Sequence, residues 1–287
     1  MKNLVILGNF DGVHIGHQNL ISSAVEYARK NNLRPIVYTF STLSKNKEFL
    51  TTINQRKELI YNLGVDEVII DDFDRVKMYT AKEFVEKILK KELNAKVVFC
   101  GYNYKFAYMK EGNVEILKDL IETIVFPEFR LENELVSSSK IRELLYIGDI
   151  YNASKLLGRN LEYRGIVVKG RQLGRLIGFP TANIKITENK IRIPNGVYGS
   201  YTKIEGYEKE FLSITNIGTN PTISDNNELN IETHILDFKD NIYDKKIKVR
   251  LCTKIRNEVK FSTIEDLKKQ INIDTNKWRI ENVKYSN

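Results

Sequence analysis

A glycine-containing stretch near the N-terminus carries two of the chain's three histidines. Residues 8–17 read Gly-Asn-Phe-Asp-Gly-Val-His-Ile-Gly-His and follow directly on an apolar run. Glycines let backbone amides approach a ligand, and the start of a helix offers unpaired N–H groups to an anion. Because residues three apart share a helix face, His14 and His17 can turn their imidazoles toward one point. We therefore expect a phosphate-handling site here, in preference to a plain strand-turn-helix junction.

A second stretch, residues 137–142, reads Ser-Ser-Ser-Lys-Ile-Arg. Hydroxyls that precede an amphipathic helix commonly cap it, and that is the simplest interpretation. Arg142 falls on the same helical face as Ser138 or Ser139, so hydroxyls, amides and a guanidinium can clasp a polyphosphate together. Paired with the two histidines, this stretch predicts the other half of a phosphate site.

The segment 165–183 combines glycines with basic residues. It lacks the Gly-x4-Gly-Lys-Ser/Thr spacing of a P-loop, and a glycine-rich turn alone is more often just a turn. We expect a cationic flap over phosphates. The glycines and cations of this flap are Lys169, Gly170, Arg171, Gly174, Arg175 and Gly178.

Two pairs of polar residues follow at a spacing of two. Thr181 and Asn183 would project oxygen atoms from one face of a strand, an arrangement that suits Mg²⁺ bound to phosphates. Glu232 and His234 share a strand face further on, and an ordinary surface strand would show the same alternation. An alcohol that is phosphorylated must lose its proton, so a positioned carboxylate is the economical base. Glu232 is the candidate base.

The order of elements predicts two domains, 1–157 and 158–287. Up to about residue 130, short apolar runs alternate with helical patterns, which indicates a Rossmann-like parallel sheet covered by helices. From about residue 158 the rhythm changes to β segments followed by one helix, which indicates a small antiparallel barrel. The expected strands are 4–7, 35–38, 68–70, 97–99, 161–169, 181–186, 197–204, 211–217, 230–238 and 246–254. The expected helices are 17–31, 52–63, 80–93, 112–123, one or two within 137–157, and 263–272.

Composition excludes several classes of protein. No apolar run reaches 18 residues and no signal peptide opens the chain, so we expect a cytoplasmic protein with no membrane partner. Cys100 and Cys252 stand in no metal-ligand spacing and are interpreted as reduced core thiols. The net charge of +8 comes from dispersed lysines and arginines, which favours phosphorylated small molecules over nucleic acid.

The N-terminal half resembles the FMN adenylyltransferase module of bacterial bifunctional riboflavin kinase/FAD synthetases. The resemblance lies in residues 8–17, 50–52, 101–106 and 137–142. It departs from the family pattern at residues 41–44, where a proline-containing stretch is usual, and at Ala107, where glycine is common. The resemblance implies that ATP phosphates are held by Gly8, Phe10, His14, His17, Ser138, Ser139 and Arg142, with Asn103 near the nucleotide or flavin.

The C-terminal half is similar to riboflavin kinases in residues 178–183, 196–198, 216–219, 232–238 and 254–256. The resemblance implies that Thr181 and Asn183 are Mg²⁺ and ATP ligands and that Glu232 acts on the ribityl 5′-hydroxyl. It places Arg256 and Phe261 near the flavin. The substrates are then riboflavin, FMN and ATP.

Three alternatives stay open at this point. The chain can be a riboflavin kinase that has lost adenylylation, or a non-catalytic flavin-binding regulator. A fragment of a class I aminoacyl-tRNA synthetase also carries a His-x-Gly-His signature, but its lysine-methionine-serine-lysine-serine loop is missing here. The expected function is phosphorylation of riboflavin to FMN, followed by adenylylation of FMN to FAD.

Overall fold

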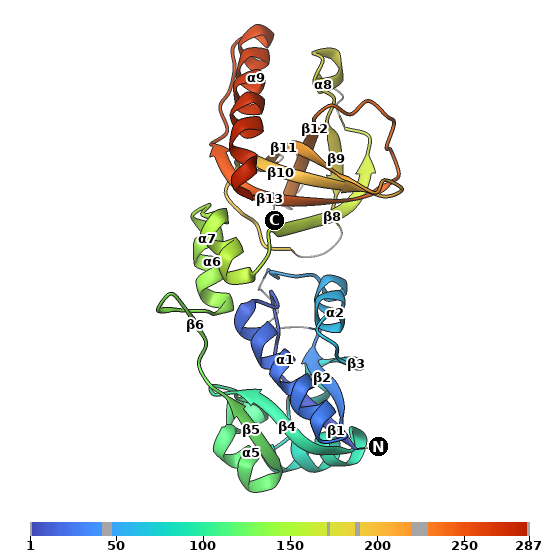
Figure 1. Ribbon diagram of the computed structural model, residues 1–287, viewed down its shortest axis with the longest axis vertical. Coiled ribbons are helices and arrows are strands. Elements are labelled where there is room, and N and C mark those ends of the chain that lie inside the picture. The colour runs from blue at the N-terminus through green and yellow to red at the C-terminus, as the bar shows by residue number, and fades with distance from the viewer. Residues whose placement is uncertain (1, 42–47, 171–172, 187–189, 220–228, 286–287) are drawn as a thin grey trace. The chain divides into compact units, whose positions relative to one another are not determined.

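The computed structural model describes residues 2–41, 48–170, 173–186, 190–219 and 229–285 (Figure 1). Contacts within the chain divide it into two compact units, Met1–Lys140 and Ile141–Asn287. Helix α6 (Ser138–Tyr146) crosses this division, and α7 (Ile150–Leu157) belongs to the second unit. The boundary at residues 157 and 158 stays a prediction.

The first unit is a parallel sheet in the strand order β3-β2-β1-β4-β5. Its strands are β1 (Asn3–Leu7), β2 (Arg34–Phe40), β3 (Glu67–Asp71), β4 (Ala95–Gly101) and β5 (Glu122–Phe126). Its helices are α1 (Ile15–Lys30), α2 (Ile53–Tyr61), α3 (Phe73–Val76), α4 (Ala81–Glu83) continuing as the π-helical η1 (Phe84–Glu92), the 3₁₀ turn η2 (Tyr108–Lys110) and α5 (Val114–Leu120). A short hairpin, β6 (Arg130–Leu131) and β7 (Glu134–Leu135), follows. The expected Rossmann-like architecture is confirmed.

Alternate residues of β1 enter two different cores, one on each face of the sheet. Leu4 and Ile6 pack in the cluster that contains the apolar face of α1, whereas Val5 and Leu7 pack in the cluster that contains η1. A strand buried on both faces must be apolar at every position, which is why residues 4–7 form an unbroken apolar run. Ligands of such sheets bind at the carboxyl ends of the strands.

The second unit is a closed barrel in the order β10-β11-β12-β9-β8-β13, with every pair antiparallel. Its strands are β8 (Leu161–Val168), β9 (Ala182–Lys185), β10 (Gly196–Ile204), β11 (Glu210–Thr219), β12 (Leu229–Ile235) and β13 (Lys246–Arg256). The short helix α8 (Leu173–Leu176) precedes β9, and α9 (Ile264–Glu281) with the 3₁₀ turn η3 (Asn282–Tyr285) follows β13. The predicted barrel with a terminal helix is confirmed (Figure 1).

Trp278 anchors α9 to the outer face of the barrel. Its ring is fully buried against Val197, Ile214 and Cys252, and its indole N–H donates to the Ser200 carbonyl at 3.3 Å. A side chain at Gly199 would collide with this ring, because an added Cβ would lie 2.4 Å from it. Helix α9 therefore covers the face of β10 on which Val197 and Gly199 lie.

The barrel interior contains a ladder of buried hydroxyls. Ser200 lies 2.9 Å from Ser213 and 2.8 Å from Thr215, measured between side-chain oxygens. Thr202 continues the ladder to Ser213 at 2.8 Å, and Thr233 continues it to Thr215 at 2.9 Å. Mutual hydrogen bonding offsets the cost of burying these polar groups.

Both cysteines are free and buried, as predicted for core thiols. Burial raises the pKa of each thiol, of Cys100 to about 12 and of Cys252 to about 12. At neutral pH both therefore stay protonated, and they take no part in the chemistry described below.

Candidate active sites

The histidine pair lies at the start of α1, immediately after the carboxyl end of β1. His14 caps the helix, because its Nδ1 accepts a hydrogen bond from the backbone N–H of His17 at 3.3 Å. The two imidazole rings stack with their centroids 3.5 Å apart and their planes 18° from parallel. Gly16 leaves room for this stack, since an added Cβ would lie 3.3 Å from the His14 ring. The expected convergence of the two imidazoles is present.

These rings open onto a cavity of about 1180 Å³ that lies within the first unit. Aromatic side chains form much of its wall; Tyr104 and Phe106 stack at 5.8 Å with an angle of 13° between their planes. Ala107 also lines it, with a positive φ of 65° and ψ of −178°. Of the residues predicted for this site, the cavity is lined by Gly8, Phe10, His14, His17, Asn103 and Ser138.

Two predicted members of the phosphate clasp lie elsewhere on α6. Ser139 is exposed and is not among the described residues that line the cavity. Arg142 stands one helical turn after Ser138 and belongs to the second unit. Their contact with phosphates stays a prediction, as does any role of residues 42–44, which lie outside the described residues.

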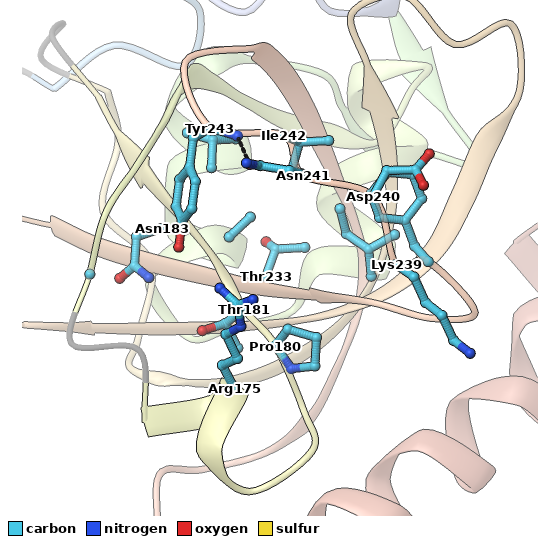
Figure 2. Close-up of a pocket in the computed structure, with 15 residues that line it drawn as sticks. Arg175, Pro180, Thr181, Asn183, Thr233, Lys239, Asp240, Asn241, Ile242 and Tyr243 are labelled. Atoms are coloured by element: carbon cyan, nitrogen blue, oxygen red, sulfur yellow. Dashed lines mark hydrogen bonds between the residues drawn. The ribbon is translucent and has the colours of Figure 1, made fainter.

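The barrel carries a second cavity, of about 370 Å³. It is lined by Thr181, Asn183 and Gly170 of the predicted site, together with Arg175, Thr233 and Tyr243 (Figure 2). Gly170 passes directly over the Asn183 amide, because an added Cβ would lie 2.3 Å from Asn183 Nδ2. Lys169 precedes it and is exposed, while Arg171 lies outside the described residues.

Gly174 holds the loop that leads into β9. Its carbonyl accepts a hydrogen bond from the Phe179 N–H at 2.8 Å, and an added Cβ would lie 2.3 Å from the Phe179 oxygen. His234 secures the same loop, since its Nδ1 lies 2.8 Å from the Pro180 carbonyl and its ring contacts Phe179 edge-on. Burial lowers the pKa of His234. His234 thus supports the loop that presents Thr181.

Strand register brings Glu232 to Asn183. The two residues are direct partners on β12 and β9, and Asn216 of β11 is the partner of Glu232 on its other side. Directly opposed residues share a sheet face, with Cβ atoms about 5 Å apart. The Asn230 amide donates to Glu232 Oε1 at 3.0 Å. Glu232 is not among the described residues that line the 370 Å³ cavity, so Asn183 is what joins the cavity to this carboxylate.

The same row continues to Arg256. Asn216 opposes Val197 on β10, and Val197 opposes Arg256 on β13. The guanidinium of Arg256 donates through Nε to buried Asp274 of α9 at 2.8 Å and lies 5.7 Å from the centre of the Phe261 ring. The predicted pair Arg256 and Phe261 is therefore in contact, on the barrel face that also carries Glu232.

The oxygen donors at the barrel cavity fit Mg²⁺. Thr181 and Asn183 both line it, and Mg²⁺ prefers oxygen ligands but takes only one or two from protein when phosphates supply others. Among the described residues, no three histidine, cysteine or acidic side chains gather as a metal cage. A nucleotide-borne ion needs no such cage.

Sequence reasoning missed the residues that hold these sites in shape. Asp11, in the turn before the histidines, is buried with Arg56 as its ion-pair partner, and Asp274 is the buried ion-pair partner of Arg256. Asp11 lies inside the motif of residues 8–17, but the motif does not indicate that its side chain is buried and bonded to a distant segment. Arg56 and Asp274 sit on amphipathic helices, where a charged residue ordinarily faces solvent.

Two family models match the chain in succession. A model described as FAD synthetase matches residues 1–140, and one described as riboflavin kinase matches residues 157–281. The junction between the matches falls at α6 and α7.

Similar proteins span nearly the whole chain. The chain is 35% identical to a bifunctional riboflavin kinase/FMN adenylyltransferase of Buchnera aphidicola, over 95% of this chain and 92% of that one. Proteins of the same description from Haemophilus influenzae and Escherichia coli K12 are 35% and 34% identical, over 93% of this chain and 90% and 89% of theirs.

One solved structure matches over both units. It is the crystal structure of a Streptococcus pneumoniae protein described as a macrolide-efflux protein, with a TM-score of 0.88, 32% identity and coverage of 97% of this chain and 94% of that one. In the described part of the present chain, no helix is both long enough and apolar enough to cross a membrane. With family matches in each unit and relatives along its length, the chain belongs to the bifunctional riboflavin kinase/FMN adenylyltransferase family.

Proposed function

We propose that the barrel phosphorylates riboflavin to FMN and that the parallel-sheet unit adenylylates FMN to FAD, each with ATP. The observation that carries this is the presence of two separate cavities, one inside each unit. Each cavity is lined by several motif residues of its own unit, and each unit matches its own family model. These observations support one site for each of two reactions with different chemical demands.

Adenylylation needs no proton acceptor. The FMN phosphate is already anionic near neutral pH, and its oxygen attacks the α-phosphorus of ATP while the bond to the departing pyrophosphate breaks. The site must align the two phosphates and stabilise developing charge. His14, His17 and the N-terminus of α1 face the cavity where that charge would develop, and Gly8, Phe10 and Ser138 line it beside them. Arg142 and Ser139 are proposed to complete the clasp.

Phosphorylation of riboflavin does need a proton acceptor. The ribityl 5′-hydroxyl is neutral, so its oxygen must lose a proton as it bonds to the γ-phosphorus of ATP and ADP leaves. Glu232 takes that proton in our proposal, because it is the carboxylate registered beside Asn183. Thr181 and Asn183 would hold Mg²⁺, which neutralises phosphate charge when bound. Lys169, Gly170 and Gly174 belong to the flap over the phosphates, and Arg256 and Phe261 to the flavin side.

A single incubation separates the candidate functions. The protein is mixed with riboflavin, ATP and Mg²⁺, and FMN and FAD are resolved by chromatography with time. We expect FMN to appear first and FAD to follow. Formation of FMN without FAD would indicate a riboflavin kinase that has lost adenylylation. Flavin binding without either product would indicate a non-catalytic flavin-binding regulator. Supplying FMN directly tests the second step by itself.

The expectation of a cytoplasmic location stays a prediction.

A further inference from the structure

The turn that precedes the histidines has a strained backbone. Phe10, Gly12 and Val13 have positive φ values of 49°, 85° and 39°, and the Val13 N–H closes the turn onto the Phe10 carbonyl at 3.1 Å. Glycine tolerates such values, but a β-branched residue such as valine rarely adopts them. Backbone strain of this kind persists only where surrounding contacts determine the conformation. The turn must therefore be held from outside.

Asp11 is the centre of those contacts. Its carboxylate is 2% exposed and accepts hydrogen bonds from the backbone N–H groups of Leu50 and Thr51, each at 3.2 Å. The Thr51 hydroxyl lies 3.3 Å from Asp11 Oδ1 and also accepts the Gly12 N–H at 3.0 Å. Thr51 thus bonds both the side chain and the backbone of the turn, from 39 residues away.

Arg56 closes this cluster from α2. Its side chain is completely buried, with Nη2 3.8 Å from Asp11 Oδ1 and Nη1 donating to the Phe40 carbonyl at 3.0 Å. In addition, the Ser138 hydroxyl donates to the Asp11 carbonyl at 2.8 Å. The turn is therefore tied to the ends of β2, α2 and α6.

We infer that Thr51, with Asp11 and Arg56, is a positioning residue for adenylyl transfer, because it holds the turn that aims His14 and His17 at the reacting phosphates. His14 follows Val13 directly, so relaxation of Val13 toward negative φ moves the first imidazole away from its stack. None of these three side chains is needed to touch substrate. The inference rests on the proposed adenylyl transfer of the first unit.

Thr51→Val tests it, because valine keeps the shape of threonine and removes the hydroxyl. A displacement of catalytic groups on the scale of 1 Å costs about a hundredfold in rate, so we expect kcat for FAD formation from FMN to fall about tenfold to a hundredfold. FMN affinity, measured by quenching of flavin fluorescence, should stay unchanged, and FMN formation by the barrel should stay unchanged in the same sample. Thr51→Ser should restore the rate.

Thr52→Ala is the matched control. The Thr52 hydroxyl caps α2 by accepting the Gln55 N–H at 3.2 Å, and no hydrogen bond joins it to residues 10–13 in the described chain. We expect this variant to melt at a lower temperature while its kcat for FAD formation is retained. Should Thr51→Val fail to fold, Arg56→Lys is measured in its place, since lysine keeps the charge and loses the guanidinium fork. We expect the same result from it, a lower kcat for FAD formation with unchanged FMN affinity.

Three results overturn the inference. They are an unchanged kcat in Thr51→Val, an equal loss of kcat in Thr52→Ala, and a loss of FMN binding that parallels the loss of turnover. The last would reduce Thr51 to a purely structural residue. A wild-type chain that forms no FAD at all would instead remove the proposed function of this unit, so the two failures are distinguishable.

Discussion

The two sites are positioned by different means. In the parallel-sheet unit the histidines follow a turn in which three residues have positive φ values, and Thr51, Arg56 and Ser138 contact that turn. In the barrel, Asn183, Glu232 and Arg256 lie on extended strands in one row that is set by strand register, and Asp274 anchors the Arg256 end. One site depends on backbone conformation, the other on side-chain alternation.

The two sites are therefore sensitive to different substitutions. A side chain on a registered strand can be exchanged without moving its neighbours, because the ladder is made by the backbone. A strained turn depends on buried partners that never meet substrate. Substitutions in the barrel row should therefore remove single chemical roles, whereas substitutions around the turn should act at a distance.

The largest expected effect comes from Glu232→Gln. The amide keeps the size of the side chain and cannot accept the hydroxyl proton, so FMN formation should fall by at least about a hundredfold. FAD formation from supplied FMN should continue at the wild-type rate, measured by chromatography. Glu210→Gln is the control, because Glu210 is paired with Arg250 on the same barrel. Loss of both activities in folded Glu232→Gln protein would contradict the two-site assignment.

His17→Ala should produce the reverse pattern. Removing one of the two stacked imidazoles takes away a group that we propose faces the developing charge, and losses of this kind cost about a hundredfold in kcat. FAD formation should fall by that order, while riboflavin is still converted to FMN. If His17→Ala slowed FMN formation equally, the histidines would not belong to a separate site.

Asp274→Asn tests how much the contact between Asp274 and Arg256 contributes to the barrel. Asp274 receives Arg256 Nε at 2.8 Å and Gln270 Nε2 at 2.9 Å, and it is buried. Hydrogen bonds to charged groups contribute about 2 kcal/mol, so the free energy of unfolding of the variant should be lower by about that amount. The variant should therefore unfold at a lower urea concentration.

Fluorescence of Trp278, the chain's single tryptophan, reports this unfolding directly because it is buried between α9 and the barrel. We also expect a higher KM for riboflavin, since Arg256 loses its anchor on the proposed flavin side. Glu265→Gln on exposed α9 surface is the control and should leave both quantities unchanged. Unchanged urea unfolding in Asp274→Asn would mean that Arg256 does not need its carboxylate.

Local pattern was sufficient to predict most elements but not all of their ends. The four expected strands of the first unit and the six of the barrel appear at their predicted places. The fifth parallel strand, β5, was missed because it follows α5 almost without a break, and the predicted helix 112–123 ran into it. Helix α9 extends to Glu281 rather than 272, because burial of Trp278 stabilises a second half with weak helix formers.

The candidate sites divide along the same line. Thr181 and Asn183 do line one cavity, but Thr181 precedes β9 and the intervening Ala182 lines the same cavity, so their role as ligands stays a prediction. The pairing of Glu232 with Asn183 is set by register between segments 49 residues apart, which no local pattern encodes. The turn that contains Phe10 and Val13 likewise has partners far away in the sequence, because Thr51 bonds Gly12 and Arg56 lies 3.8 Å from Asp11.

The smallest expected effect concerns a second strained position of the parallel-sheet unit. Ala107 lines the large cavity with φ of 65° and ψ near 180°, a region that belongs almost entirely to glycine. Ala107→Gly should relieve strain, and the gain should exceed the added entropy of the unfolded chain, for a net stabilisation of about 1 kcal/mol. Calorimetry should show the first unit melting at a higher temperature.

Ala28→Gly is the control, because the same kind of substitution should destabilise the first unit at this position. Ala28 is buried within α1, where glycine costs about 1 kcal/mol relative to alanine. If Ala107→Gly destabilised the first unit as Ala28→Gly does, the left-handed conformation at residue 107 would not be a strain on the fold. The turn before the histidines would then differ from residue 107, because buried Asp11 accepts hydrogen bonds that hold the turn in its conformation.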